Sequence, residues 1–289
     1  MIASTRTAPA HLIHIRPNQS WLRVDWSGLW RYRDLLVLLV QRDFTAKYQQ
    51  TILGPIWFIV NPLINSVVFT ILFSKIIGIA TDGVPPMLFY LGGQLSWNYF
   101  ANVLGSTGNS LTGNAGIFSK VYFPRLIPPL AMCGSSFIAF ALQFAVFFAF
   151  WLYYAVATPF GATLQLSWSL ALLPLLIIQT AALGLGVGLV FSAVTAKYRD
   201  LQHLTGYIMQ IGMYATPVIY PLSRIPADWR WVAYLNPMTS IVELTRVILL
   251  GVGSVTVTGY VGSLVITAGV LLGGIVLYQR TARTFVDTV

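Results

Sequence analysis

The sequence predicts an all-α integral membrane protein with a single membrane domain. Of its 289 residues, 56% are hydrophobic and only 9% are charged, whereas soluble domains carry about 25% charged residues. Apolar stretches of the roughly 20 residues that a helix needs to cross a bilayer recur along nearly the whole chain. The alternating segments of about ten residues that indicate a transmembrane barrel are not seen in the sequence.

Six transmembrane helices are expected. They would span residues 53–76, 86–110, 127–155, 168–194, 202–220 and 257–278. Most of the 17 Lys and Arg residues fall on one side of this arrangement. The positive-inside rule places that side, with both termini, in the cytoplasm. The net charge of +9 is therefore an orientation signal, and no nucleic-acid partner is expected.

An N-terminal amphipathic surface helix is expected at residues 30–47, before the first span. Apolar and charged side chains share this stretch, so the helix would lie along the cytoplasmic surface of the membrane. Its apolar residues are Leu35, Leu38, Leu39 and Phe44. Two roles remain open for this helix, as a lipid anchor or as a docking element for a partner.

Segment 221–253 is expected to form two short re-entrant helices on the external side, between spans five and six. Its second half is apolar enough for a seventh span. However, Glu243 and Arg246 would then lie near mid-membrane, where an arginine costs about 2.5–3.5 kcal/mol. The two residues are three apart and can pair on one face of a helix.

The sequence also predicts how these external helices begin and where they lie. Asn236 is a suitable N-cap for the second helix, with Pro237 at the first helical position. Trp229 and Trp231 fit the aromatic belt at a membrane interface.

Three spans carry uncharged polar and aromatic residues at helical spacing, which places each set on one helix face. These stripes predict a hydrated path through the bundle; the alternative is that the amides only hydrogen-bond neighbouring helices. The residues are Trp57, Asn61 and Asn65 in the first span, Gln94, Asn98, Asn102 and Asn109 in the second, and His203, Tyr207, Gln210 and Tyr214 in the fifth.

The sequence contains no residues that indicate ion coupling, ATP binding or catalysis by this chain. No Asp or Glu lies within the six spans, so ion-coupled transport would have no evident charge carrier. The phosphate-binding pattern G-x-x-x-x-G-K-[ST] is absent, as are catalytic and metal-binding motifs. The glycines of GLGVG (184–188) are more typical of close helix packing.

The stretch GIFSKVYFPRLIPP (116–129) combines basic residues and prolines between two apolar spans. A helix in lipid tolerates neither interior proline nor unpaired charge, so this stretch is expected outside the membrane. Pro124 and the pair Pro128–Pro129 would stop the flanking helices, leaving a stiff, exposed, basic element.

Five segments are distinctive when taken together. They are QRDFTAKYQQTILGPIWFIVNPL (41–63), SKVYFPRLIPPLA (119–131), FSAVTAKYRDL (191–201), TPVIYPLSRIP (216–226) and LNPMTSIVELTR (235–246). In this order they resemble the permeases of type-2 ATP-binding-cassette exporters. Within that family they look most like the subunits that export lipid-linked polysaccharide, such as O-antigen or teichoic-acid precursors.

The resemblance implies a homodimer that works with two copies of a separate cytoplasmic ATPase. ATP and Mg²⁺ would be held by that partner, and this chain would hold no cofactor. A lipid-linked glycan would follow the polar stripes, with membrane lipid around the helices of a bacterial inner-membrane protein. The permease domain would cover residues 30–280, between a cytoplasmic arm (1–29) and a cytoplasmic tail (281–289).

The resemblance also implies three elements that couple to the ATPase. These are the surface helix, a cytoplasmic gate segment at 112–126 and the turn after the fourth span. The matching residues are Arg42, Asp43 and Lys47 in the first, Lys120, Tyr122, Phe123, Pro124 and Arg125 in the second, and Lys197, Arg199 and Asp200 in the third. An external gate would be formed by residues Trp229, Trp231, Asn236, Glu243 and Arg246.

Two other functions remain open at this point. An exporter of a small hydrophobic molecule or drug from the same family would share the coupling motifs and differ in the lining of its channel. A membrane-embedded enzyme or assembly scaffold that is independent of ATP would have no ATPase partner.

Overall fold

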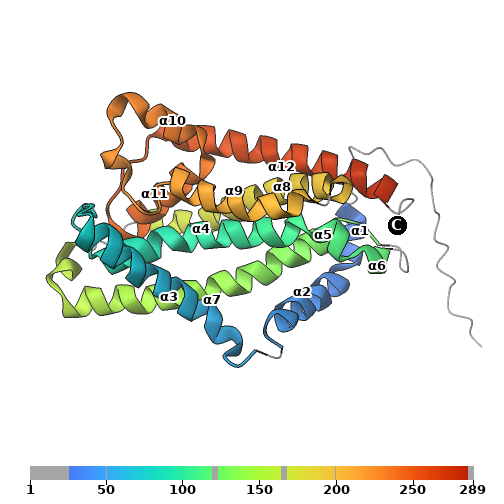
Figure 1. The fold of residues 1–289 in the computed structure, drawn as a ribbon, viewed down its shortest axis with the longest axis horizontal. Coiled ribbons are helices and arrows are strands. Elements are labelled where there is room, and N and C mark those ends of the chain that lie inside the picture. Colours follow the sequence, from blue (N-terminus) through green and yellow to red (C-terminus); the bar gives the residue numbers. More distant parts are fainter. Residues whose placement is uncertain (1–25, 50, 119–122, 164–167, 199, 286–289) are drawn as a thin grey trace, which may run out of the picture.

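The computed structural model describes residues 26–49, 51–118, 123–163, 168–198 and 200–285. These residues form a bundle of helices and contain no strand (Figure 1). Four helices in them are long and apolar enough to cross a bilayer, namely Gly54–Ile76, Ile127–Ala157, Ser169–Lys197 and Val257–Thr284. The predicted all-α membrane protein is therefore confirmed at this level.

The helices occur in the expected order along the chain. They are α1 (Trp26–Arg31), α2 (Arg33–Tyr48), α3 (Trp57–Phe69) with a π-helical extension (Thr70–Ile76), α4 (Pro86–Gly108), α5 (Ser110–Gly113), α6 (Ala115–Phe118), α7 (Ile127–Ala157), α8 (Leu173–Lys197), α9 (Leu201–Ala215), α10 (Arg230–Leu235), α11 (Pro237–Leu250) and α12 (Val257–Phe285). Short 3-10 turns at Gly54–Ile56, Pro159–Thr163, Trp168–Leu172, Leu222–Arg224 and Ala227–Trp229 join some of them.

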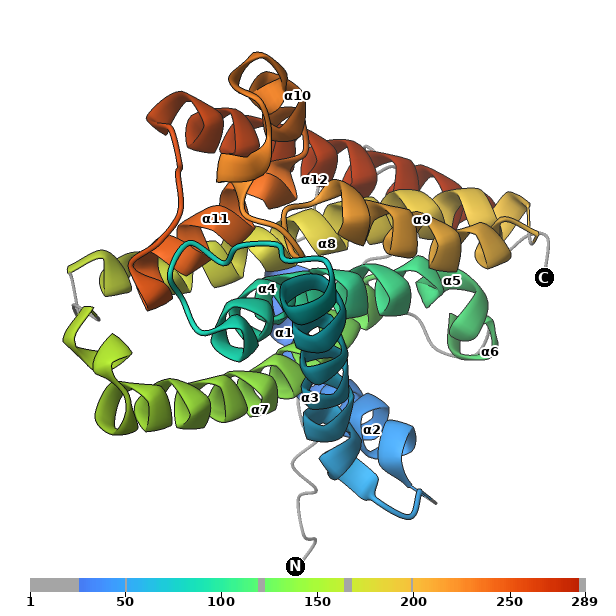
Figure 2. The ribbon, with the colours of Figure 1, turned by 60° about the vertical axis from the view of Figure 1, so that its left-hand side comes forward.

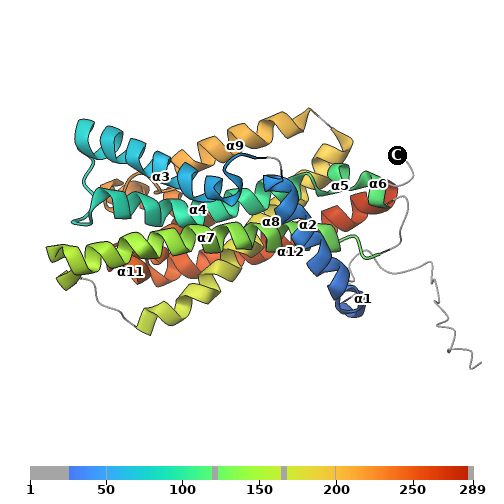
Figure 3. The same cartoon turned by 90° about the horizontal axis from the view of Figure 1, so that it is seen from below.

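Helix α4 lies at the centre of the bundle (Figures 1 and 3) and contacts α3, α7, α8, α9 and α11. Leu88 and Val103, near its two ends, are both fully buried. Since protein surrounds most of α4, its polar residues can be satisfied without lipid contact. With 23 residues, α4 is long enough to span a bilayer. Because it is buried, it can be less apolar than the four helices named above.

Glycines bring α8 close to two neighbouring helices. A Cβ atom on Gly184 would lie 3.0 Å from the Phe100 carbonyl oxygen of α4, and one on Gly186 would lie 2.8 Å from the Leu271 Cα of α12. Only glycine allows backbones to approach this closely. The packing role predicted for GLGVG is therefore confirmed.

Helix α2 does not present a single apolar face. Leu39 is buried against Phe123 and Ile127, whereas Val37 and Leu38 on the other side of the helix are more than half exposed. The predicted apolar set is thus divided, because α2 packs on α7 and turns Leu38 away from it.

The fifth predicted span, 202–220, differs in the structure. Helix α9 ends at Ala215, and Thr216 has an extended backbone with φ −100° and ψ 141°. Proline disfavours the helical conformation of the residue before it, so Pro217 ends the helix. Thr216 and Val218 are nonetheless fully buried. Irregular backbone in this position requires hydrogen-bond partners from the protein.

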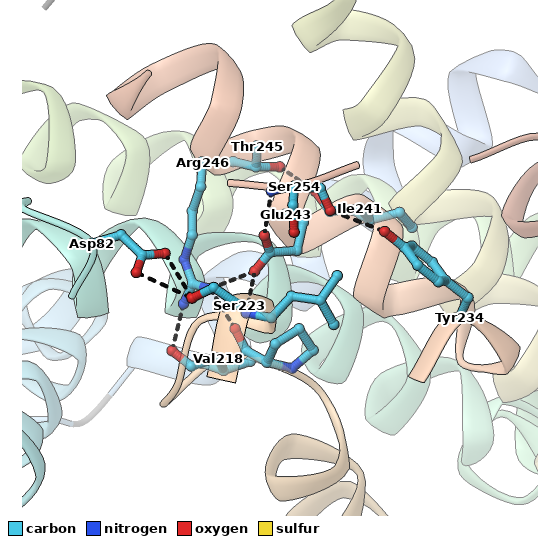
Figure 4. Close-up of polar contacts among 11 residues, drawn as sticks. Asp82, Val218, Ser223, Tyr234, Ile241, Glu243, Thr245, Arg246 and Ser254 are labelled. Carbon is cyan, nitrogen blue, oxygen red and sulfur yellow. Dashed lines mark hydrogen bonds and ion pairs between the residues drawn. The ribbon is translucent and has the colours of Figure 1, made fainter. Parts of the chain in front are cut away.

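Arg246 of α11 supplies those partners (Figure 4). Its Nη2 donates to the Val218 carbonyl oxygen at 2.7 Å, and its Nη1 donates to the Pro217 carbonyl oxygen. The guanidinium also lies over the ring of Phe89, 3.8 Å from the centroid. A Cβ on Gly93 would come within 2.6 Å of Nη2, so a glycine of α4 makes room for the guanidinium.

Glu243 completes this cluster. Its Oε1 accepts from Arg246 Nη1 at 3.1 Å and from the Leu222 N–H at 3.3 Å, while its Oε2 accepts from the Ser254 N–H at 3.1 Å. The predicted pair is confirmed. Both side chains are almost fully buried, and the pair joins α11 to the segment before it and to the loop after it.

The N-terminal end of α11 follows the predicted capping. The Asn236 side chain accepts from the Met238 N–H at 3.0 Å, with Pro237 at the first position. Gly251 ends the helix in the left-handed conformation, with φ 71°. The 14 residues of α11 extend for about 21 Å. This is shorter than the roughly 30 Å of a bilayer core.

Replacing Arg246 by methionine is expected to destabilise the protein strongly. The change leaves Glu243 buried without its cation and removes the donors to two buried carbonyl groups. Breaking a buried pair in this way costs about 3–5 kcal/mol. The double variant Glu243→Gln with Arg246→Met removes both charges and should recover part of that loss. Thermal unfolding of the purified variants in detergent measures both effects, and a single variant as stable as the parent would contradict the assignment.

Candidate functional site

A hollow of about 240 Å³ lies between α3, α4 and α7. Five amide side chains line it, and we call it the amide hollow. The lining amides are Asn61 and Asn65 from α3, Asn98 and Asn102 from α4, and Gln143 from α7; Trp57, Phe58, Pro62 and Ala101 complete the lining. The structure therefore brings together the predicted stripes of the first and second spans.

Helical spacing explains why these side chains meet. Asn61 and Asn65 are four residues apart, as are Asn98 and Asn102, so each pair lies on one face of its helix. Asn65, Asn98 and Gln143 lie about half-way along their respective helices. Polar groups at this depth require a protein partner or water.

The amides of the hollow have few protein partners. Asn98 Nδ2 donates to Gln143 Oε1 over a long 3.4 Å. Within the described part of the chain, no side-chain hydrogen bond is recorded for Asn61, Asn65 or Asn102. Their hydrogen-bonding capacity is thus available to water or to a hydroxyl-rich ligand.

Two amides of the second predicted stripe lie outside the hollow's polar lining. Gln94 is buried and donates to the Ser66 hydroxyl at 3.0 Å, which is the helix-packing role considered as the alternative. Asn109 follows the end of α4, is exposed, and donates weakly to the Gly105 carbonyl oxygen. The same helical stripe therefore contains side chains in different environments.

The α9 stripe does not line the hollow but lies near it. Helices α3 and α9 lie on the same side of α4 (Figures 2 and 3). A close approach of Gly212 to the Trp97 ring holds α9 against α4. Tyr207 and Tyr214 are 65% and 50% exposed. The remaining stripe residues, His203 and Gln210, are exposed too.

Sequence reasoning missed Gln143. This residue lies among the phenylalanines of α7, of which Phe140 and Phe147 are buried in the core. Gln143 is the only amide in a 31-residue helix whose other polar side chains are small hydroxyls, a thiol and tyrosines. Because a lone amide in a membrane span requires a partner, this feature could have identified it.

The described coupling residues belong to α2, to the residues just before α7 and to the turn between α8 and α9, and these elements lie toward one end of the bundle (Figure 1). The Arg42 guanidinium contacts the Asp43 carboxylate at 2.7 Å and donates to the Asn114 Oδ1 at 3.3 Å, which joins α2 to the segment before α6. Lys47 is exposed at the end of α2, and Lys197 and Asp200 are exposed around the turn between α8 and α9.

Helix α5, where the gate segment begins, and the described end of that segment are docked on the bundle. The Ser110 and Ser192 hydroxyls lie 3.0 Å apart, and the buried Tyr278 hydroxyl donates to the Arg125 carbonyl oxygen at 3.1 Å. Phe123 is only 5% exposed and packs against Leu39 of α2. The expectation of an exposed element is thus wrong for Phe123, because an apolar ring is buried between α2 and α7.

Three predicted coupling residues, Lys120, Tyr122 and Arg199, lie outside the described residues. Pro124 and Arg125 are described and are half-buried. The predicted external-gate residues Trp229, which ends the 3-10 turn before α10, and Trp231, within α10, are each 64% exposed. Helix α10 lies toward the other end of the molecule (Figure 1).

Comparison with known proteins gives consistent matches. The family described as ABC-2 type transporter matches residues 34–250. An O-antigen export system permease protein of Klebsiella pneumoniae is 26% identical over 88% of this chain and 94% of its own. A protein with the same description from Myxococcus xanthus is 27% identical over 74% of this chain and 79% of its own. A polysialic acid transport protein of Escherichia coli is 21% identical over 72% of this chain and 78% of its own.

These relatives are transporter proteins and not enzymes. The family match covers α2 to α11, including all the helices that form the amide hollow and the Glu243–Arg246 pair. The chain therefore belongs to the ABC-2 type transporter family as a permease.

Proposed function

We propose that this chain is the membrane subunit of an ATP-driven exporter that moves a lipid-linked polysaccharide from the cytoplasm across the bacterial inner membrane. The observation that carries the proposal is the amide hollow, an uncharged polar space half-way along the bundle. The O-antigen export named for two of the relatives supports the same substrate class.

We propose six spans, in which α4 and α9 join the four most apolar helices. Both termini would then lie in the cytoplasm, in agreement with the charge distribution. Helices α10 and α11 would form an external gate, with the exposed Trp229 and Trp231 at the interface. Glu243 and Arg246 would hold this gate on the end of α9.

The subunit would act as a homodimer. The open side of α3 and α9 exposes large apolar residues such as Ile64 and Ile211, which are 53% and 66% exposed. Apposition of this side in two copies would enclose the tyrosines of α9 and the mouths of both amide hollows. The polymer would pass between the copies.

Uncharged amides and tyrosines are suited to a moving polymer. Each hydrogen bond to a sugar contributes only about 0.5–1.5 kcal/mol net, so one contact can replace another as the chain slides. Fixed charges would hold a repeating chain more tightly and in one register. The polar lining argues against a small hydrophobic substrate, and the family match argues against a scaffold independent of ATP.

The energy would come from two copies of a cytoplasmic ATPase, which would hold ATP and Mg²⁺. Helix α2, the segment 112–126 and the turn around Lys197 would form its docking surface. The Arg42–Asn114 contact joins the first two of these elements. A push on α2 would therefore reach the gate segment and, through Ser110 and Ser192, the core helix α8.

Changing Asn98, Asn102 and Tyr214 together to leucine is expected to abolish surface display of the glycan. The substitutions remove the uncharged hydrogen-bonding groups that the proposed path requires. Immunodetection of the glycan on whole cells measures the effect, with the amount of permease in the membrane as a check. The matched control is the pair Tyr153→Leu and Gln279→Leu, on α7 and α12. Unimpaired display by the triple variant would refute the path.

Changing Arg42 and Lys197 together to alanine is expected to reduce glycan export at least several-fold, because both residues lie on the proposed docking surface. Co-purification of the ATPase with the permease measures docking, and the rate of ATP hydrolysis in the complex measures coupling. The control, Arg224→Ala, removes an exposed arginine at the opposite end and should leave ATPase binding and glycan export unchanged. Normal ATPase binding and export in the double variant would contradict the docking surface.

A further inference from the structure

We propose that the amide hollow is a binding subsite for a single uncharged sugar ring, so that the exporter favours neutral glycan segments over acidic ones. The inference rests on the proposed function and narrows its substrate class. It follows from the size of the hollow, the type of hydrogen-bonding groups in it and the lack of charge in its lining.

The size of the hollow fits one ring. Pockets for drug-sized ligands have volumes of about 300–1,000 Å³, and the hollow has about 240 Å³. A water molecule takes about 30 Å³ of liquid volume, so the space corresponds to a small cluster of waters. A monosaccharide unit can replace such a cluster with its own hydroxyl groups.

The lining presents the groups that a sugar requires. A primary amide has two donors and one acceptor oxygen, and a sugar hydroxyl both donates and accepts. Asn61, Asn65 and Asn102 come from two helices and leave these groups available toward the hollow. Trp57, which is 41% exposed, adds an indole face beside them. An apolar ligand would leave the amides without hydrogen-bond partners, which makes its binding free energy less favourable.

The lining also opposes charged ligands. None of its nine residues is Asp, Glu, Lys, Arg or His. A carboxylate or phosphate that displaced the water from the hollow would lose hydration without gaining a counter-charge, which is unfavourable. A neutral hexose or deoxyhexose unit avoids this cost. The hollow therefore discriminates by charge as well as by hydrogen bonding.

Gln143 is the residue that we expect to determine this selectivity. It is the only contribution of α7 to the lining, and its side chain is nine-tenths buried. The hydrogen bond that it accepts from Asn98 is long, at 3.4 Å. A sugar hydroxyl between these two amides would form shorter bonds with both, and Gln143 would then set the position of the ring.

The test uses the permease–ATPase complex in nanodiscs and two lipid-linked oligosaccharide probes of equal length. One probe contains only neutral hexoses, and the other contains a uronic acid in each repeat. Stimulation of ATP hydrolysis is measured against probe concentration. The neutral probe is expected to stimulate at a concentration at least about tenfold lower than the acidic probe.

Variants at position 143 connect this selectivity to the hollow. Gln143→Leu should raise the half-maximal concentration of the neutral probe about fivefold, as expected for one lost hydrogen bond. Gln143→Asn retains an amide and should give an intermediate value, which separates a lost contact from a misfolded protein. Gln279→Leu on α12 makes the same chemical change outside the site and should have no effect.

The possible outcomes separate the two proposals. Equal stimulation by both probes, or an unchanged response of Gln143→Leu, would overturn the subsite while the exporter function stands. A complex that responds to neither probe would overturn the proposed function, and the subsite with it. Preference for the acidic probe would also overturn the inference.

Discussion

The fold depends on the guanidinium of Arg246, which donates hydrogen bonds to backbone carbonyl groups where a helix ends inside the bundle. Pro217 ends α9 inside the bundle and leaves buried backbone carbonyl groups, which must find donors. Arg246 donates to two of them while it pairs with Glu243 and lies over Phe89. The cluster thus fixes α11, the end of α9 and the central helix α4 against one another.

Much of this cluster could be predicted from the sequence, because the relevant rules are local. The spacing of Glu243 and Arg246 indicated their pairing, and Asn236 before Pro237 indicated where α11 begins; both are confirmed. The early end of α9 was missed, although Pro217 is a direct signal. Hydropathy over 202–220 dominated the prediction, since an apolar extended segment and an apolar helix have similar composition.

The candidate site was predicted in part. Helical spacing identifies the residues that share a face, but it does not identify what that face meets. Gln94 and Asn98 are one turn apart, yet Gln94 is bound to Ser66 and Asn98 faces the amide hollow. Gln143 was missed because its aromatic neighbours suggested packing. Phe123 was expected to be exposed because of the basic residues around it, whereas tertiary packing buries its ring.

The central claim is that the amides half-way along the bundle face an aqueous path, and cysteine accessibility tests it most directly. Cys133 is the only cysteine, so a Cys133→Ala background allows single probes at Asn65→Cys and Asn102→Cys, with Ala149→Cys on an exposed position of α7 as the control. In native membranes, a charged, membrane-impermeant thiol reagent should label positions 65 and 102 and not position 149. Protection of both positions in every nucleotide state of the complex would contradict the account.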